Sequence, residues 1–170
     1  VWITDTQYLS QTYPQYFDSA CQWIVSNKDV YDIKLVIHTG DIVNNGTDLS
    51  QWENANHSMS ILLGDDIPYC WDAGNHDVVT SNWNGGSFLA FNVTFLRSKT
   101  YWAADCLDGR NTAVAFNVSE YTFLVVNIEY HANSTVLQWL DTILDAHPQS
   151  HVIVATHAYL NETCGYGNDG

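Results

Sequence analysis

The amino-acid sequence predicts an α/β sandwich with two mixed β-sheets that are flanked by helices. Short apolar runs rich in Val and Ile alternate along the chain with segments whose apolar residues recur at helical spacing. Two of these runs, residues 112–118 and 122–128, are so close in sequence that they predict an antiparallel hairpin. At 170 residues the chain has the length of one domain, which we assign to residues 1–170.

The first half of the chain predicts a parallel arrangement of strands. Val1-Trp2-Ile3 belongs to the first strand, residues 16–28 form a helix, and residues 33–38 form the second strand. Because a helical crossover connects these two strands, they are expected to pair in parallel. A turn follows at Asn44-Asn45-Gly46, and a third strand covers residues 67–71.

A second helix precedes that third strand. Asp48 or Ser50 caps it, since both side chains accept hydrogen bonds from free backbone N–H groups. The helix extends through Leu63, and Gly64 stands where helices commonly end. Its buried face is predicted to consist of Trp52, Ala55, Met59 and Leu62.

The second half of the chain begins with a long segment that is rich in Trp, Asn and Gly. Residues 78–110 resemble an insertion on the substrate side, with one short helix at 88–96. After the hairpin, residues 134–146 form an amphipathic helix, and residues 151–155 form a buried strand. The apolar face of this helix is predicted to consist of Val136, Leu137, Leu140, Ile143 and Leu144.

Four predicted strands share one feature, a turn at their end that presents an acid, an amide or an imidazole. The four turns carry Asp5, Gly40-Asp41, Gly74-Asn75-His76-Asp77 and His157. In open α/β sheets, ligands bind outside the carboxyl ends of the strands. Hard cations take carboxylate and amide oxygens, and imidazole suits zinc, iron and similar metals. The four turns together therefore predict a metal centre.

Ordinary structural roles are the alternative for each of these residues. The two aspartates can act as capping carboxylates, Asn75 as a turn residue, and His157 as a histidine at a strand end. His38 lies inside the end of its strand and is predicted to be a hydrogen-bonded core residue rather than a ligand.

The motifs Gly40-Asp41 and Gly74-Asn75-His76-Asp77, with Asp5 before them and His157 after them, resemble the calcineurin-like metallophosphoesterases. The resemblance extends from about Trp2 to Tyr159 and implies the fold of that family, two sheets with metals at the strand ends. Two positions depart from the family pattern. Asp5-Thr6-Gln7 stands where members carry Asp-x-His, and no Gly-His-x-His segment follows His157.

The resemblance implies two divalent metal ions, with Asp41 as the ligand that bridges them. Asp5 would bind the first metal, where Gln7 is either a further ligand or a polar turn residue. Asn75 and His157 would bind the second metal. Zn, Mn, Fe, Mg and Ca all stay open as the metal.

By the same resemblance, the chain would hydrolyse phosphate mono- or diesters through attack by a metal-bridging hydroxide. His76 is expected to face the substrate, where it stabilises charge or protonates the leaving oxygen. Asp77 is expected to orient His76. The substrate itself stays open.

The charge of the chain restricts its partners. The formal net charge is −14, from 19 acidic residues and 5 Lys plus Arg, which argues against nucleic acid and anionic membranes as partners. A phosphate ester would also be repelled unless metal ions reverse the local potential. No apolar run approaches the ~20 residues of a membrane span.

Six Asn-x-Ser/Thr sequences predict a secreted glycoprotein. They lie at Asn45, Asn56, Asn92, Asn117, Asn133 and Asn161. In a secreted chain, the four cysteines would form two disulfides by any of three pairings. These cysteines are Cys21, Cys70, Cys106 and Cys164.

A second class of function also fits the sequence. A non-catalytic glycoprotein could keep the fold as a structural or self-assembling extracellular subunit, which Gln7 and the absent final motif favour. The chain also begins within a strand and stops in a loop, so we expect it to be a fragment. Self-association and a further C-terminal segment are the two ways in which such a fragment would be completed.

Overall fold

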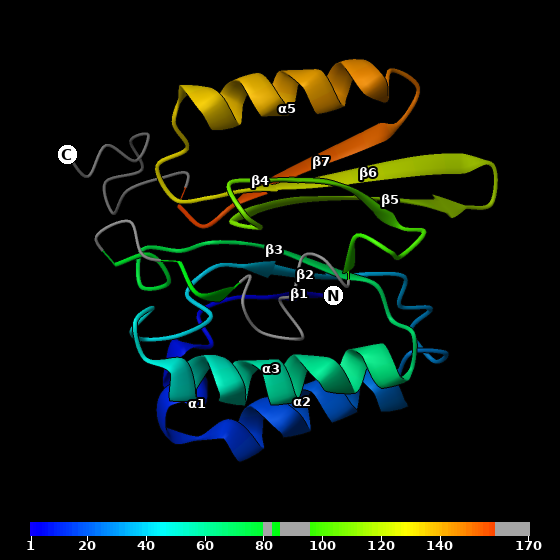
Figure 1. The fold of residues 1–170 in the computed structure, drawn as a ribbon. Coiled ribbons are helices and arrows are strands. Elements are labelled where there is room, and N and C mark those ends of the chain that lie inside the picture. The colour runs from blue at the N-terminus through cyan, green and yellow to red at the C-terminus, as the bar shows by residue number, and fades with distance from the viewer. Residues whose placement is uncertain (80–82, 86–95, 159–170) are drawn as a thin grey trace, which may run out of the picture.

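A computed structural model describes residues 1–79, 83–85 and 96–158. In this part of the chain, one mixed sheet lies between two layers of helices (Figure 1). Its strands are β1 (Trp2–Ile3), β2 (Val36–Thr39), β3 (Tyr69–Asp72), β4 (Trp102–Cys106), β5 (Asn111–Val118), β6 (Tyr121–Ile128) and β7 (His151–Thr156). The helices are α1 (Gln7–Thr12), α2 (Pro14–Ser26), α3 (Leu49–Gly64) and α5 (Ser134–Ala146).

The sheet consists of two halves that share one short antiparallel contact. Strands β1, β2 and β3 are parallel and form the first half; β4, β5, β6 and β7 form the second. The halves join where β3 meets β5 in antiparallel fashion at a single register pair, Asp72 with Asn111. Leu35, Cys70, Val114 and Val125 pack together in one apolar cluster, which is drawn from both halves. The prediction of two sheets is therefore not confirmed, because the described strands form one curled sheet.

Helices α1, α2 and α3 cover the first half of the sheet (Figure 1). Pro14 is the first residue of α2. Proline has no backbone N–H, and at this position the helix offers no acceptor for one. Asp48 caps α3 by accepting a hydrogen bond from the Ser50 backbone N–H at 3.0 Å, which decides between the two predicted caps. The predicted buried face of α3 is confirmed, since four of its side chains are fully buried: Trp52, Ala55, Met59 and Leu62.

Helix α5 covers the second half and has the predicted bounds. Leu140, Ile143 and Leu144 pack against an apolar cluster on β5 and β6. The prediction for Leu137 is wrong, because its side chain is 48% exposed and Trp139 packs against the sheet instead. The helix has more apolar residues than can pack against the sheet at once, so one of them stays exposed.

Strand β7 has the predicted position but not the predicted burial. It pairs with β6 alone among the described strands, so it forms an edge of the sheet. Val152, Ile153 and Val154 are each more than 40% exposed as a result. An edge strand has a neighbouring strand on one side only, and the hydrophobicity of its sequence does not show whether it lies at an edge.

Two elements were absent from the sequence prediction, namely α1 and β4. The predicted short helix at 88–96 lies outside the described residues, apart from its last position. Residues 83–85 and 96–110 of the predicted insertion contain β4, which pairs with β5.

The predicted disulfides do not agree with the structure. Cys21, Cys70 and Cys106 are free, and Cys164 lies outside the described residues. Two disulfides among four cysteines would require at least one bridge among these three. Cys21 and Cys70 belong to different apolar clusters, and neither forms a disulfide with the other or with Cys106.

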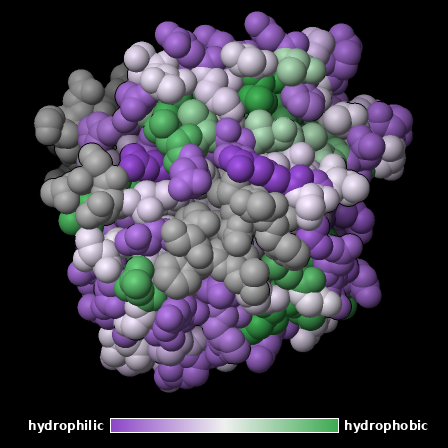
Figure 2. Space-filling view, viewed as in Figure 1, coloured by the Kyte–Doolittle hydropathy of each residue, from purple (hydrophilic) through white to green (hydrophobic). Residues whose placement is uncertain are grey.

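The surface is mainly polar in the face shown in Figure 2, where hydrophobic residues form small separate patches. Among the described helices, none has the length and hydrophobicity that a membrane crossing requires.

His38 is a core residue, as predicted. Its side chain is fully buried and its Nε2 lies 2.9 Å from the Thr6 hydroxyl. Burial lowers the pKa of His38 to about 3. The unfolded chain therefore binds more protons than the native chain between about pH 3 and the ordinary histidine pKa of about 6.5.

We therefore expect His38 to reduce stability as the pH falls through this window. Each pH unit costs up to about 1.4 kcal/mol in the free energy of unfolding. The measurement is urea unfolding between pH 6.5 and pH 4.5 for the wild type and for His38→Gln, which keeps a bond to Thr6 without a proton to gain. The wild type should lose more stability than the variant over this range. Equal losses would show that His38 does not contribute.

Candidate metal centre

The candidate site lies at one edge of the sheet because of the strand directions. Strands β1, β2 and β3 are parallel, and their ends align through the register pairs Ile3 with His38 and Thr39 with Asp72. Strand β6 returns antiparallel to β5 and thus points the same way as β3, and β7 is parallel to β6. The turns after β1, β2, β3 and β7 consequently meet, as the sequence predicted.

Two glycines allow the turns after β2 and β3 to touch. A Cβ atom on Gly40 would lie 2.5 Å from the backbone nitrogen of Gly74, and a Cβ on Gly74 would lie 2.3 Å from that of Asp41. Neither approach is compatible with a side chain. The contact places the Asp41 carboxylate against the turn that carries Asn75 and His76, since the Asp41 Oδ1 accepts a hydrogen bond from the His76 N–H at 2.9 Å.

Asp5 and Asp41 both adopt left-handed backbone conformations, with φ of 55° and 51°. Such conformations are uncommon for residues other than Gly and cost on the order of 1–3 kcal/mol each, and they concentrate at functional sites. In both turns, the conformation follows directly after a strand of the first half. It turns the two carboxylates toward the same point.

Three predicted ligands form a cluster. One ligand atom each from Asp5, Asp41 and His157 lies within 4.8 Å of the other two. The His157 Nδ1 is 2.8 Å from the Thr39 carbonyl oxygen, which only accepts, so Nδ1 carries the proton in the neutral imidazole. The lone pair of Nε2 then faces the Asp41 Oδ1 at 3.5 Å. Electron pairs that converge without a proton between them fit a bound cation.

Asn75 and Gln7 complete the group of predicted ligands. The Asn75 Oδ1 lies 3.1 Å from the His157 Nε2, so the amide oxygen faces the same point as the imidazole. The Gln7 Nε2 donates to the Asp41 Oδ2 at 3.3 Å, while its buried Oε1 has no hydrogen-bond partner. This unpartnered oxygen also fits a metal. If the Gln7 amide rotated, its oxygen would face the Asp41 carboxylate, and a cation between the two oxygens would stabilise that arrangement.

His76 lies at the border of this cluster. Its Nδ1 is 3.0 Å from the Asn44 carbonyl oxygen, which fixes the ring, and its Nε2 is 3.9 Å from the Asp41 Oδ2. The side chain is 38% exposed. His76 is not part of the cluster of candidate ligand atoms, and its role facing the substrate stays a prediction.

Asp77 has different partners from those that the sequence predicted. Its carboxylate accepts hydrogen bonds from the backbone N–H groups of Val43 and Gly74, both at 2.9 Å. It therefore holds the turns after β2 and β3 together, and the Asn44 carbonyl rather than Asp77 orients His76. Burial raises the pKa of Asp77 to about 7, although the two amide donors act in the opposite direction.

A second set of polar residues beside the centre was not predicted. Arg110 precedes β5, and Glu129 and Tyr130 follow β6, at the same edge of the sheet. Burial raises the pKa of Glu129, and Asn111 and Arg110 oppose this shift. The sequence contained a signal for them, because Glu129 follows a predicted strand just as Asp5 and Asp41 do.

The sequence profile of the calcineurin-like phosphoesterases matches residues 1–170. The chain belongs to the calcineurin-like phosphoesterase family. Membership implies a phosphoesterase type of hydrolase with a metal site, and the candidate centre lies where the resemblance places it. The mixed α/β fold agrees with this assignment.

Two further proteins resemble this family member. The protein YvnB of Bacillus subtilis (strain 168), described as uncharacterized, is 34% identical over 164 residues. The match covers 94% of the chain but only 12% of YvnB, so the chain spans about an eighth of that relative. The structure of purple acid phosphatase PPD1 from yellow lupin (Lupinus luteus) seeds superposes with a TM-score of 0.53 at 14% identity. It covers 85% of the chain and 26% of the lupin protein, and this likeness concerns the fold.

Gln7 is the residue of this family member that departs most from the expected ligands. Imidazole binds zinc and similar metals better than an amide oxygen does. We therefore expect Gln7→His to increase the affinity for Zn²⁺ by roughly tenfold or more. Calorimetric titration measures this change, with Gln11→His on the exposed side of α1 as the control. An unchanged affinity would place residue 7 outside the centre.

Proposed function

We propose that this chain is the catalytic region of a secreted hydrolase that uses two divalent metals to cleave phosphate mono- or diesters. The observation that supports it best is the convergence of Asp5, Asp41 and His157 within 4.8 Å at the strand ends. Asp41 lies at the centre of the group, since it contacts Gln7, His76 and His157. Asp41 would therefore be shared by the two metals, with Asp5 and Gln7 as further ligands of the first and Asn75 and His157 as further ligands of the second.

The metals would supply an activated water and neutralise charge on the phosphate. The protein residues would do the remaining work. His76 is held by the Asn44 carbonyl with its Nε2 side partly exposed, a position from which it can donate a proton to a leaving oxygen. Asp77 fixes the two turns that carry Asp41 and His76. The net charge of −14 would repel a phosphate ester elsewhere on the surface and leave the metal centre as its binding place.

Secretion is part of this proposal because of the six glycosylation sequences. Asn45 and Asn117 are exposed and Asn56 is partly exposed, so three of the sites are accessible to a glycan in the folded chain, whereas the exposed Asn133 lines a pocket beside the metal centre. Asn92 and Asn161 lie outside the described residues. Mass spectrometry of the natural protein should find glycans on several of these residues.

A test of the catalytic proposal measures bound metal and hydrolysis together. The chain is loaded with Mn²⁺ or Zn²⁺, and the hydrolysis of phenyl phosphate and of an aryl phosphodiester is followed. Two bound metals per chain and hydrolysis of either ester would support the enzyme. A chain that binds no metal, hydrolyses neither ester and self-associates would instead support the non-catalytic glycoprotein, which Gln7 in place of histidine favours.

A further inference from the structure

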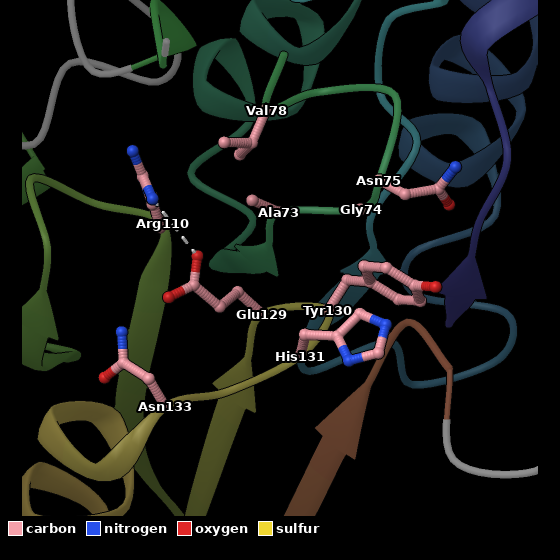
Figure 3. A pocket seen from close by; sticks show the side chains of 9 residues that line it. All are labelled: Ala73, Gly74, Asn75, Val78, Arg110, Glu129, Tyr130, His131 and Asn133. Atoms are coloured by element: carbon pink, nitrogen blue, oxygen red, sulfur yellow. Dashed lines mark ion pairs between the residues drawn. The ribbon is translucent and has the colours of Figure 1, made fainter. Parts of the chain in front are cut away.

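A pocket of about 330 Å³ adjoins the candidate metal centre at the same edge of the sheet (Figure 3). The loop after β3, the start of β5, the end of β6 and the cap of α5 form its walls. Asn75 lines the pocket and also contacts His157, and the Tyr130 ring lies 6.0 Å from the His157 ring. A phosphate at the metal centre would therefore have its ester group within reach of this pocket.

Arg110 and Glu129 face each other across one wall of the pocket (Figure 3). The Arg110 Nη1 is 3.7 Å from the Glu129 Oε2, and the side chains are 21% and 7% exposed. Strands β5 and β6 pair Thr112 with Asn127, and Arg110 and Glu129 continue this register beyond the strands. Opposite charges at such facing positions attract each other.

The backbone fixes the pair beside the metal centre. The Ala73 N–H donates to the Arg110 carbonyl at 2.9 Å, and the Tyr130 N–H donates to the Ala73 carbonyl at 2.9 Å. The Glu129 N–H donates to the Asn111 side chain at 2.8 Å. Because Ala73 directly precedes the turn of Gly74 and Asn75, the pocket and the candidate ligands share one rigid frame.

The chemistry of the pair suits hydroxyl groups. A guanidinium supplies N–H donors and a carboxylate supplies acceptors, whereas each hydroxyl both donates and accepts, so neighbouring hydroxyls can bind both side chains. A second anionic group on the substrate would meet the carboxylate of Glu129, which repels it. A purely apolar group would cover the polar wall without adding a hydrogen bond to it.

We propose that this pocket binds the alcohol part of the substrate and selects phosphate esters of sugar-like, hydroxyl-bearing alcohols through Arg110 and Glu129. This inference rests on the proposed function and specifies its substrate class. The volume lies at the lower end of the range of about 300–1,000 Å³ for ligand sites, which suits a single ring-sized group. Tyr130 offers an aromatic face on which such a ring can lie.

The test compares three esters on the Mn²⁺-loaded protein: a hexose phosphate, phosphoglycolate, which carries a carboxylate, and phenyl phosphate. In Glu129→Gln, kcat/KM for the hexose phosphate should fall roughly tenfold or more, with little change for phenyl phosphate. Arg110→Lys keeps the charge but loses the planar fork, and it should show the same selective loss. Glu120→Gln in the exposed turn between β5 and β6 is the matched control, and melting curves verify that each variant folds.

Two results would overturn the inference while leaving the proposed function intact. One is an equal fall for all three esters in Glu129→Gln, which would give the pair no selective role. The other is a preference for phosphoglycolate over the hexose phosphate that becomes larger in Glu129→Gln. That result would show that the pocket binds an anionic group.

A binding measurement tests the inference about the pocket independently of hydrolysis. Calorimetry compares the hexose phosphate with inorganic phosphate on the same Mn²⁺-loaded protein. If no ester is hydrolysed, the proposed function fails, and the binding measurement alone then tests the inference about the pocket. Tighter binding of the hexose phosphate that weakens roughly tenfold in Glu129→Gln would support the pocket. Equal binding of the two ligands, or binding that the variant leaves unchanged, would overturn it.

Discussion

Asp41→Asn should remove metal binding and any phosphatase activity while leaving the fold intact. Asp41 is the carboxylate that contacts Gln7, His76 and His157, so the loss of its charge affects both predicted metals. Changes to residues that merely support metal ligands already lower metal affinity by about 10–100-fold, and loss of the bridging ligand should lower it by roughly 100-fold or more. Metal content after dialysis and hydrolysis of phenyl phosphate measure the two effects.

The structure explains why this variant should fold. Asn is among the residues that tolerate the left-handed conformation of position 41, and its side chain has the shape of Asp. Its Oδ1 can still accept from the His76 N–H, and its new amide group can donate to the Gln7 oxygen, which has no partner. Asp141→Asn on the exposed face of α5 is the matched control. Full metal content and full activity in Asp41→Asn would show that the centre is assigned wrongly.

His76→Ala should separate metal binding from catalysis. His76 lies outside the cluster of candidate ligand atoms, so the variant should keep its metal. The side chain is partly exposed beside Asp41, and loss of a proton-transfer group there typically lowers kcat by about 10²–10⁴-fold. Metal analysis and the kcat for phenyl phosphate are measured on the same preparation.

His57→Ala provides the control for His76→Ala, because His57 is 74% exposed on α3 and lies next to Asp18. It should change neither quantity. If His76→Ala lost metal in proportion to activity, His76 would be a ligand.

Much of the candidate site followed from the sequence because it depends on local rules. Strong apolar runs located β2, β3 and β7, and the polar residue after each run located Asp41, Asn75 and His157. The direction of each strand then brought these residues to one edge. Their role as ligands stays a prediction, which the convergence at Asp41 supports.

Other features depend on contacts that no local pattern encodes. Helix α1 has six residues, too few to show a period, and its cap Thr6 makes no side-chain hydrogen bond to the helix. Strand β4 contains a register shift between Trp102 and Ala104, which interrupts any alternation. The role of Asp77 could not be predicted either, since its partners Val43 and Gly74 are backbone groups of two different turns.

The pairing of Arg110 with Glu129 lies between these cases. The hairpin that joins them was predicted, and its register places the two residues opposite each other. The sequence nevertheless gave no reason to extend the ladder beyond the predicted strands, because Arg110 belonged to the segment predicted as an insertion.

The single register pair that joins the two halves of the sheet has a consequence for folding. Asp5 and Asp41 project from the first half, and His157 projects from the second, so two cations that share Asp41 as a ligand would link the halves through Asp5 and His157. Such a cation binds the native chain and not the unfolded one, and at 100 times its dissociation constant it stabilises the native state by about 2.7 kcal/mol. The free energy of unfolding would then increase with the concentration of free metal, in addition to the apolar cluster and the hydrogen bonds that already join the two halves.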